Sequence, residues 1–181
     1  NALRRIAEYY FMPPEFIRVE NNLEKAAETY LRITEEFPNS PYYQESLYKL
    51  GWTYYRMSDF PTSVEYFAMA LDVNYFDRVV DDDVNVLDIA SESINYIGIC
   101  FAVETAEWAG AGIDNMAVWL DEHPDRRHNY GRDLIIQLGE IYRNQIGRYE
   151  PAVEVYRKYL DVFPLDPRMP EVMQNIVEIY Q

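Results

Sequence analysis

The stretch LYKLGWTYYRMSDFPTSVEYFAMAL, which runs from Leu47 to Leu71, decides the fold class. Its first half carries apolar residues at intervals of three or four, along one stripe of an α-helix: Leu47, Leu50, Tyr54 and Met57. Ser58 and Asp59 then predict a turn and an N-cap, and Pro61 suits the first turn of a second helix. That helix has its own apolar face: Val64, Phe67, Ala68 and Leu71. The stretch therefore predicts a helix, a short turn and a second helix.

The same pattern returns between Leu134 and Pro164, in LIIQLGEIYRNQIGRYEPAVEVYRKYLDVFP. The pair Leu138-Gly139 matches Leu50-Gly51, and Tyr156 matches Phe67 after one residue that we expect to be inserted in the turn. A glycine lets two helices approach closely, and an aromatic ring can fill the groove between them. The two copies therefore predict the same helix-to-helix contact.

Weaker copies cover most of the remaining chain. They are INYIGICF with IDNMAVWLDEHP, LRRIAEYYF with LEKAAETYLRITEEFP, and the half-copy MPEVMQNIVEIYQ. We expect helices at about 2–11, 22–37, 42–57, 60–73, 87–107, 112–122, 130–145, 149–162 and 168–181. The chain is thus expected to be a single array of helix pairs, at about 2–38, 42–74, 87–124 and 130–164, followed by a terminal helix at 168–181.

The two strong copies resemble the tetratricopeptide repeat (TPR) family. Its pattern of Trp, Leu-Gly, Tyr, Ala, Phe, Ala and Pro is matched by two sets of residues: Leu47, Leu50-Gly51, Tyr54, Ser63, Phe67, Ala70 and Tyr75, and Ile135, Leu138-Gly139, Tyr142, Ala152, Tyr156, Tyr159 and Pro164. The resemblance implies an all-α, right-handed superhelical solenoid. It also implies a non-catalytic scaffold or adaptor that binds an extended peptide or a partner protein in a concave groove. Residues 37–67 are further similar to bacterial envelope TPR proteins allied to outer-membrane assembly lipoproteins, which implies a periplasmic or envelope location.

In this family the first helix of each pair lines the concave face. By position within the repeat, the expected groove residues are Tyr48, Trp52, Tyr55, Arg56, Asn95, Ile99, Ile136, Glu140, Arg143 and Asn144. Tyr, Trp and Arg are the residue types that dominate binding hot spots, so the second copy predicts a recognition surface. The alternative is that Trp52 and Tyr55 pack against the preceding pair. Tyr48 and Trp52 stand where the family's clamp for a terminal carboxylate has Lys and Asn, so that peptide-binding mode is not expected.

The net charge limits the classes of partner that the protein is expected to bind. Sixteen Lys and Arg residues stand against 31 Asp and Glu, a net charge of −15, which disfavours nucleic acid and anionic membranes and favours a basic partner protein. There is no apolar run of membrane-spanning length. The single cysteine, Cys100, lies in an apolar run and is interpreted as a buried hydrophobic residue. The sequence contains no phosphate loop, nucleophile elbow or HExxH motif, so neither an enzyme nor a cofactor is expected.

The acidic stretch DRVVDDDVNVLDIASE raises a metal hypothesis. Asp81, Asp83, Asn85 and Glu92 fall at positions one, three, five and twelve of a calcium-binding loop. Val86 stands where such a loop needs glycine, and we prefer the alternative that these acids lie at the N-terminal end of a helix. A weaker hypothesis places zinc among His123, His128 and Asp125 in DEHPDRRHNYGRD. The alternative, which we prefer, is a polar loop of exposed residues, with Pro124 ending the preceding helix.

The terminal helix carries Met173, Ile176 and Val177, which a chain ending there would expose. This predicts further repeats, a partner or self-association through the C-terminal end. The first residue, Asn1, is not an initiator methionine, so we expect a segment of a longer protein. The alternatives for function are a self-associating architectural solenoid and an accessory domain of a larger enzyme or of a secretion or assembly machine.

Overall fold

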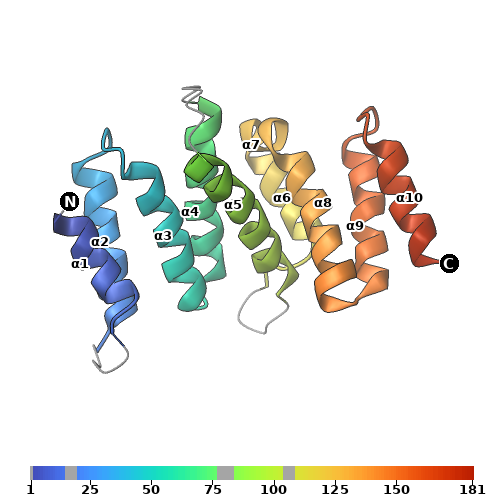
Figure 1. Cartoon of the computed structure of the whole chain (residues 1–181). Helices are drawn as coiled ribbons and strands as arrows, with labels where there is room; N and C mark the ends of the chain where they lie inside the picture. The colour runs from blue at the N-terminus through green and yellow to red at the C-terminus, as the bar shows by residue number, and fades with distance from the viewer. Residues whose placement is uncertain (1, 15–19, 77–83, 104–108) are drawn as a thin grey trace. The chain divides into compact units, whose positions relative to one another are not determined.

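The computed structural model describes residues 2–14, 20–76, 84–103 and 109–181, with 74–76 and 84–88 described at the level of the backbone (Figure 1). The described residues form ten α-helices and one π-helical turn, which confirms the all-helical prediction. The helices are α1 (Ala2–Phe11), α2 (Asn22–Glu36), α3 (Tyr43–Arg56), α4 (Phe60–Phe76), α5 (Val84–Ala102), α6 (Ile113–Glu122), α7 (Pro124–Asn129), α8 (Gly131–Glu140), α9 (Tyr149–Val162) and α10 (Met169–Ile179). The π-helical turn, η1, spans Ile141–Ile146 and continues α8.

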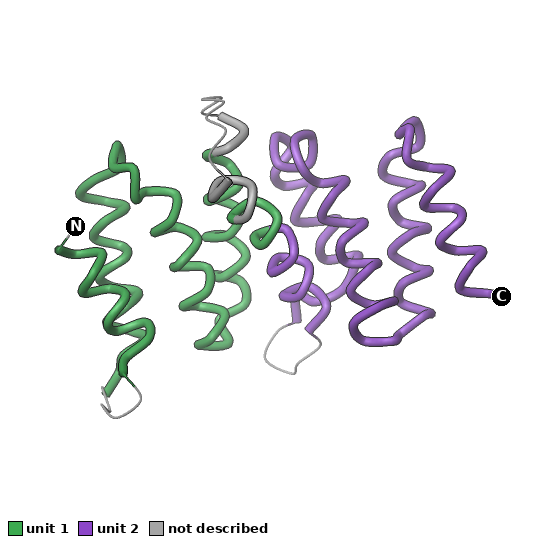
Figure 2. Tube along the Cα trace, viewed as in Figure 1, with its two compact units in different colours: residues 1–93 green, residues 94–181 purple. Residues whose placement is uncertain are grey.

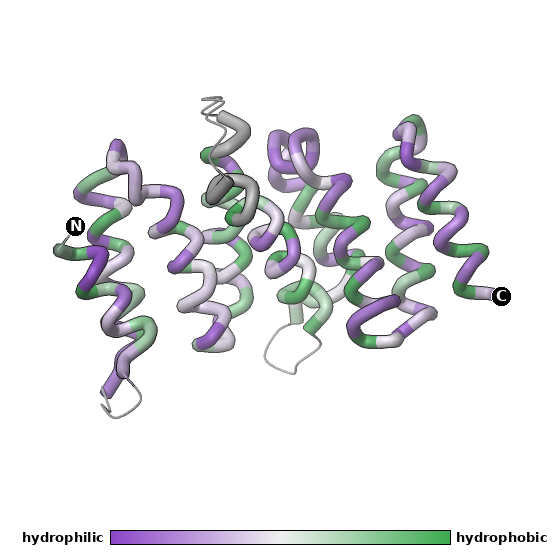
Figure 3. Tube along the Cα trace, in the orientation of Figure 1, coloured by the Kyte–Doolittle hydropathy of each residue, from purple (hydrophilic) through white to green (hydrophobic). Residues whose placement is uncertain are grey.

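The chain divides into two compact units, residues 1–93 and 94–181, which are coloured separately in Figure 2. In unit 1, α1 packs on α2, α2 on α3 and α3 on α4. In unit 2, α8 packs on α9 and α9 on α10, with α6 against α8 and α9. Hydrophilic and hydrophobic residues alternate along these helices (Figure 3), as expected for helices that bury one face against their neighbours. No helix in the described part of the chain is both long and apolar enough to cross a membrane.

The glycine-to-aromatic contact of the two strong copies is present in both units. A Cβ atom added to Gly51 would lie 2.7 Å from Cδ1 of Phe67, and one added to Gly139 would lie 2.5 Å from Cε1 of Tyr156. Both rings are fully buried. The predicted close approach of paired helices is therefore confirmed. Gly98 differs. A Cβ atom added to it would lie 2.7 Å from Cδ1 of Ile141, so this glycine allows the close approach of η1 and not of α6, the second helix of its own pair.

The second strong copy is one residue longer than the first. We expected the extra residue in the turn between the two helices, but this was wrong, because it lies in the first helix of the pair. Ser58, which lies two residues after the end of α3 and has φ 61°, follows Gly51 by seven residues. Gly147, its equivalent with φ 74°, follows Gly139 by eight. The added residue therefore lies before Gly147, where the backbone forms the π-helical turn η1. A π-helical turn accommodates one extra residue within a helix.

The segment between α6 and α8 is helical, so the polar loop expected there was also wrong. His123 ends α6, and Pro124 then begins the short helix α7, because proline is favoured at the first position of a helix. The helix expected at 87–107 begins earlier, at Val84, and ends at Ala102. Residues 104–108 lie outside the described part of the chain.

Candidate functional site

The α3 residues expected to line a groove lie in different environments. Tyr48 is only 9% exposed; its ring lies 5.8 Å from that of Phe67, and its hydroxyl is hydrogen-bonded to the Glu92 carboxylate. Tyr48 is therefore part of the packing between helices. Trp52, Tyr55 and Arg56 keep part of their surface accessible to solvent.

Trp52 is held by the preceding helix pair. It packs against the buried cluster of unit 1, which is formed by Ala7, Phe11, Ala26, Ala27, Tyr30, Ile33 and Leu50. Its outer side meets Tyr55 edge-to-face, with ring centroids 5.9 Å apart. Tyr55 makes a second edge contact, also at 5.9 Å, with Phe60 of α4. The two expected groove aromatics thus have fixed ring orientations.

Arg56 caps the C-terminal end of α1. Its Nη1 donates to the Phe11 carbonyl oxygen at 2.6 Å, and its guanidinium lies 4.9 Å from the Phe11 ring centroid. Lys49 also lies over that ring, at 5.3 Å. The last carbonyl groups of a helix lack partners within the helix and attract cations, which explains why α3 sends two basic side chains there. We name the partly exposed residues Trp52, Tyr55 and Arg56 the α3 patch.

In unit 2 the expected groove residues hydrogen-bond between successive first helices of the pairs. Asn95 on α5 accepts a hydrogen bond from Gln137 on α8 at 2.9 Å. Arg143 on η1 donates to Asn175 at 3.0 Å and to Glu178 at 2.8 Å, both on α10. These positions therefore serve contacts between helices as well as a surface. Ile99 and Ile136 are half-buried beside them.

Glu140 connects the same helices to α9. Its carboxylate accepts a hydrogen bond from the Tyr156 hydroxyl at 2.7 Å and another from the Asn144 side-chain amide. Burial, together with the adjacent carboxylate, raises the pKa of Tyr156 well above its ordinary value. Tyr156 therefore stays a neutral hydrogen-bond donor across the physiological pH range. The arrangement supports rigid packing rather than proton transfer.

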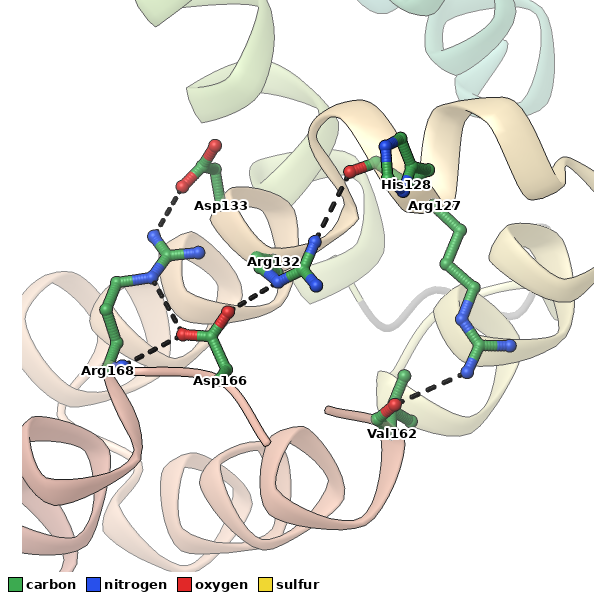
Figure 4. A network of polar contacts seen from close by, with 7 residues as sticks. All are labelled: Arg127, His128, Arg132, Asp133, Val162, Asp166 and Arg168. Carbon is green, nitrogen blue, oxygen red and sulfur yellow. Dashed lines mark hydrogen bonds and ion pairs between the residues drawn. The ribbon is translucent and has the colours of Figure 1, made fainter. Parts of the chain in front are cut away.

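Sequence reasoning missed an ionic network at the linker between α9 and α10 (Figure 4). Asp166 is buried and binds Arg132 of α8 and Arg168, whose backbone N–H also donates to it at 2.9 Å. Arg168 also donates to Asp133 at 2.6 Å. Burial alone would raise the pKa of Asp166, but the hydrogen bonds from Arg168 and Arg132 lower it to about 2. The sequence did contain a signal for a structured linker here, because FPLDPR at residues 163–168 is similar to FPNSPY at residues 37–42.

The metal hypotheses gain no support from the described residues. Asp81 and Asp83 lie outside them, whereas Asn85 and Glu92 both lie on the helical backbone of α5. Among the described residues, no group of three or more His, Cys, Asp and Glu side chains could hold a metal ion. Nδ1 of His123 lies 2.8 Å from the Trp119 carbonyl oxygen, so this nitrogen is engaged within α6.

Comparison with known proteins shows that two segments of the chain are similar to a known repeat. The tetratricopeptide repeat family model matches residues 45–74 and 133–166, which are the segments around Gly51–Phe67 and Gly139–Tyr156. No curated protein matches the sequence, and nothing found supports the resemblance to outer-membrane assembly lipoproteins. The matched segments comprise α3 with α4 and α8 through α9, each a closely packed pair. The described part of the chain is therefore all-helical, and two of its helix pairs are similar to tetratricopeptide repeats.

Proposed function

We propose that this protein is a non-catalytic scaffold or adaptor whose α3 patch binds a partner protein. The tetratricopeptide repeat implies protein partners, and no catalytic family is found for the chain. A separate surface within unit 2, formed by Ile99, Glu140, Arg143 and Asn144 with Asn95, is also proposed to contact a partner. The net charge of −15 favours a partner with basic segments.

The observation that carries the proposal is the fixed geometry of the α3 patch. An exposed arginine and two aromatic rings normally lose much side-chain entropy when they bind a partner. Here the Phe11 carbonyl oxygen already holds Arg56, and edge contacts already orient Trp52 and Tyr55. These side chains should therefore lose little further conformational entropy when a partner binds them.

Site-specific photo-crosslinking tests this proposal. A photoreactive phenylalanine at Tyr55 is expected to capture a discrete partner protein from an extract of the source organism. Tyr149, a half-exposed aromatic residue on α9, is the matched control position. Arg56→Gln should lower the yield at position 55 without changing the circular dichroism spectrum. Equal capture of the same proteins at positions 55 and 149 would show that the α3 patch has no specific role.

Self-association is a second candidate, favoured by the exposed apolar stripe of α10. Met173 and Val177 are each 54% exposed and Tyr180 is 69% exposed, whereas Ile176 is half-buried. A stripe at intervals of four and three residues can bury itself against another helix. Light scattering should then show a dimer that Met173→Glu with Val177→Glu converts to a monomer. Val118→Glu, at an equally exposed position on α6, is the control and should leave the dimer intact.

A further inference from the structure

The linkers after α2 and after α9 have the same backbone structure. The N–H groups of Phe37, Ser40 and Tyr43 each donate at 3.0 Å, to the carbonyl groups of Ile33, Phe37 and Ser40. The equivalent N–H groups of Phe163, Asp166 and Met169 donate at 2.9, 3.1 and 3.1 Å to Tyr159, Phe163 and Asp166. Phe37 and Phe163 also adopt nearly equal backbone angles, with φ −135° and −128° and ψ 57° and 61°. The two linkers can therefore be compared residue by residue.

In unit 2, arginine side chains cover the linker. The guanidinium of Arg132 lies 4.6 Å from the Phe163 ring centroid, and that of Arg127 lies 5.8 Å from it. Arg127 also donates to the carbonyl oxygen of Val162, the last residue of α9, at 3.4 Å (Figure 4). As a result, Phe163 is only 8% exposed. The last turn of α9 has no basic residue of its own, so α7 and α8 supply the cations that its C-terminal end attracts.

In unit 1, the equivalent surface is open. Phe37 is 50% exposed, and the described residues place no guanidinium over its ring. The guanidinium of Arg4 lies over Tyr42 instead, 5.0 Å from the ring centroid, and is paired with Glu8 and Glu45. Beside Phe37 is a cavity of about 280 Å³, lined by Ala2, Leu3, Arg4, Ile33, Phe37, Ser40 and Tyr42. This group of residues is called the α2-end site below.

The α2-end site also presents unmet polar groups. The last turn of α2 contains Glu35 and Glu36 and no basic residue. Arg32, one turn earlier, pairs with Glu36, so Glu35 and the helix dipole leave this C-terminal end negative. The Nε–H of Arg4 is buried in the described structure without an acceptor. A buried donor without an acceptor calls for a ligand or water. The site therefore offers an aromatic face and negative charge to a cation, and a donor to a carbonyl group.

We propose that the α2-end site binds an arginine side chain from a protein partner, with the guanidinium over Phe37 as Arg127 and Arg132 lie over Phe163. The aliphatic stem of that arginine occupies the apolar cavity, and the peptide carbonyl beside it accepts from Arg4. Arginine suits the site better than lysine, because its planar guanidinium stacks on an aromatic ring while donating to a carbonyl oxygen. The acidic surroundings of the site favour a partner segment of basic character.

A ¹⁵N-resolved NMR titration tests the assignment, with the capped tripeptide acetyl-Leu-Arg-Leu-amide as the probe. Saturable shifts are expected at the amides of Phe37, Ser40 and Thr34. The matched peptide with citrulline, which has the same shape without the charge, should bind about tenfold more weakly or not at all. Phe37→Ala should abolish the shifts while preserving the fold, since the Phe37 side chain is half-exposed.

An internal control uses the occupied site. The double variant Arg127→Ala with Arg132→Ala removes both guanidinium groups from the Phe163 ring, so that the arginine peptide should produce a second set of shifts near Phe163. Tyr55→Ser should change neither set, which separates this site from the α3 patch. Equal binding of the citrulline peptide, or no shifts at Phe37, would overturn the assignment.

Discussion

Replacing Gly139 by alanine adds a methyl group where the ring of Tyr156 already lies. The new Cβ would lie 2.5 Å from Cε1, 2.9 Å from Cζ and 3.0 Å from Cδ1 of that ring. The ring is fully buried and its hydroxyl donates to Glu140, so it cannot move without losing contacts or this hydrogen bond. Because 2.5 Å is far inside van der Waals contact, the overpacking cost lies in the upper part of the usual range, at about 2–3 kcal/mol. Alanine recovers about 1 kcal/mol because glycine is unfavourable inside a helix.

The expected net change is a loss of about 1–2 kcal/mol in the free energy of unfolding. Urea denaturation followed by circular dichroism measures it. Gly131→Ala is the control, because its added Cβ lies 3.4 Å from the flexible end of Leu120, which is ordinary contact. That variant should stay within about 0.5 kcal/mol of the wild type.

A double-mutant cycle isolates the contact itself. In a Tyr156→Leu background the ring is absent, so Gly139→Ala should no longer destabilise the protein, and the coupling free energy should reach about 1 kcal/mol or more. Unchanged or higher stability of the single variant, or additive effects in the cycle, would refute the interpretation that Gly139 exists to admit the ring.

The ionic network, the π-helical turn and the cap on α1 each give a further prediction. The pKa of Asp166 is about 2 in the folded protein, below its ordinary value of 3.8, so this carboxylate stabilises the fold above about pH 4 and loses that effect as the pH falls toward 2. The full effect of about 2.4 kcal/mol is reduced to about 1–2 kcal/mol, because the arginine partners are about a third exposed to screening solvent. Acid titration of Asp166→Asn should therefore show lower stability at pH 7 and a shallower decline between pH 4 and 2; parallel curves would contradict this. Deleting Gln145, exposed within η1, should convert the π-helical turn to an α-helical turn and keep stability within about 1 kcal/mol of the wild type. A larger loss in urea denaturation would mean that the extra residue is needed for packing. Arg56→Met keeps the apolar stem but loses the donor to the Phe11 carbonyl oxygen, so unfolding should become easier by about 1 kcal/mol, with partial recovery in Arg56→Lys. Equal stability of all three proteins would contradict the cap.

The helix pairs were predictable because a helix that buries one face carries apolar residues every three or four positions, and this spacing is visible in the sequence. Gly51 and Phe67 lie at a spacing that suits paired helices, and the structure places the Phe67 ring against Gly51 as expected. The short helix α7 was not predictable from the same signal. Pro124 can follow the end of one helix or begin another, and local sequence does not separate these two roles.

The candidate site was only partly predictable, because surface exposure depends on neighbours that are distant in sequence. Tyrosine is a residue type that is common in binding surfaces, yet the Tyr48 ring packs against Phe67 and its hydroxyl is hydrogen-bonded to Glu92. The role of Arg56 depends on where α1 ends, 45 residues earlier in the chain. Repeat position indicates which side of a helix a residue occupies. It does not indicate whether the adjacent pair has already bound that residue.

The π-helical turn explains why repeat position is least reliable in the second strong copy. Each residue added within a helix rotates the following side chains by about 100° around the axis, since an α-helix has 3.6 residues per turn. Asn144 stands five residues after Gly139, as Arg56 stands five after Gly51, yet Arg56 binds α1 and Asn144 binds Glu140 of its own helix. The glycine-to-aromatic contact is kept in both copies, so the insertion is absorbed beyond it, among exposed residues. Packing of the pair therefore determines the register, and the surface residues after Ile141 take new partners, which is how Arg143 comes to bind α10.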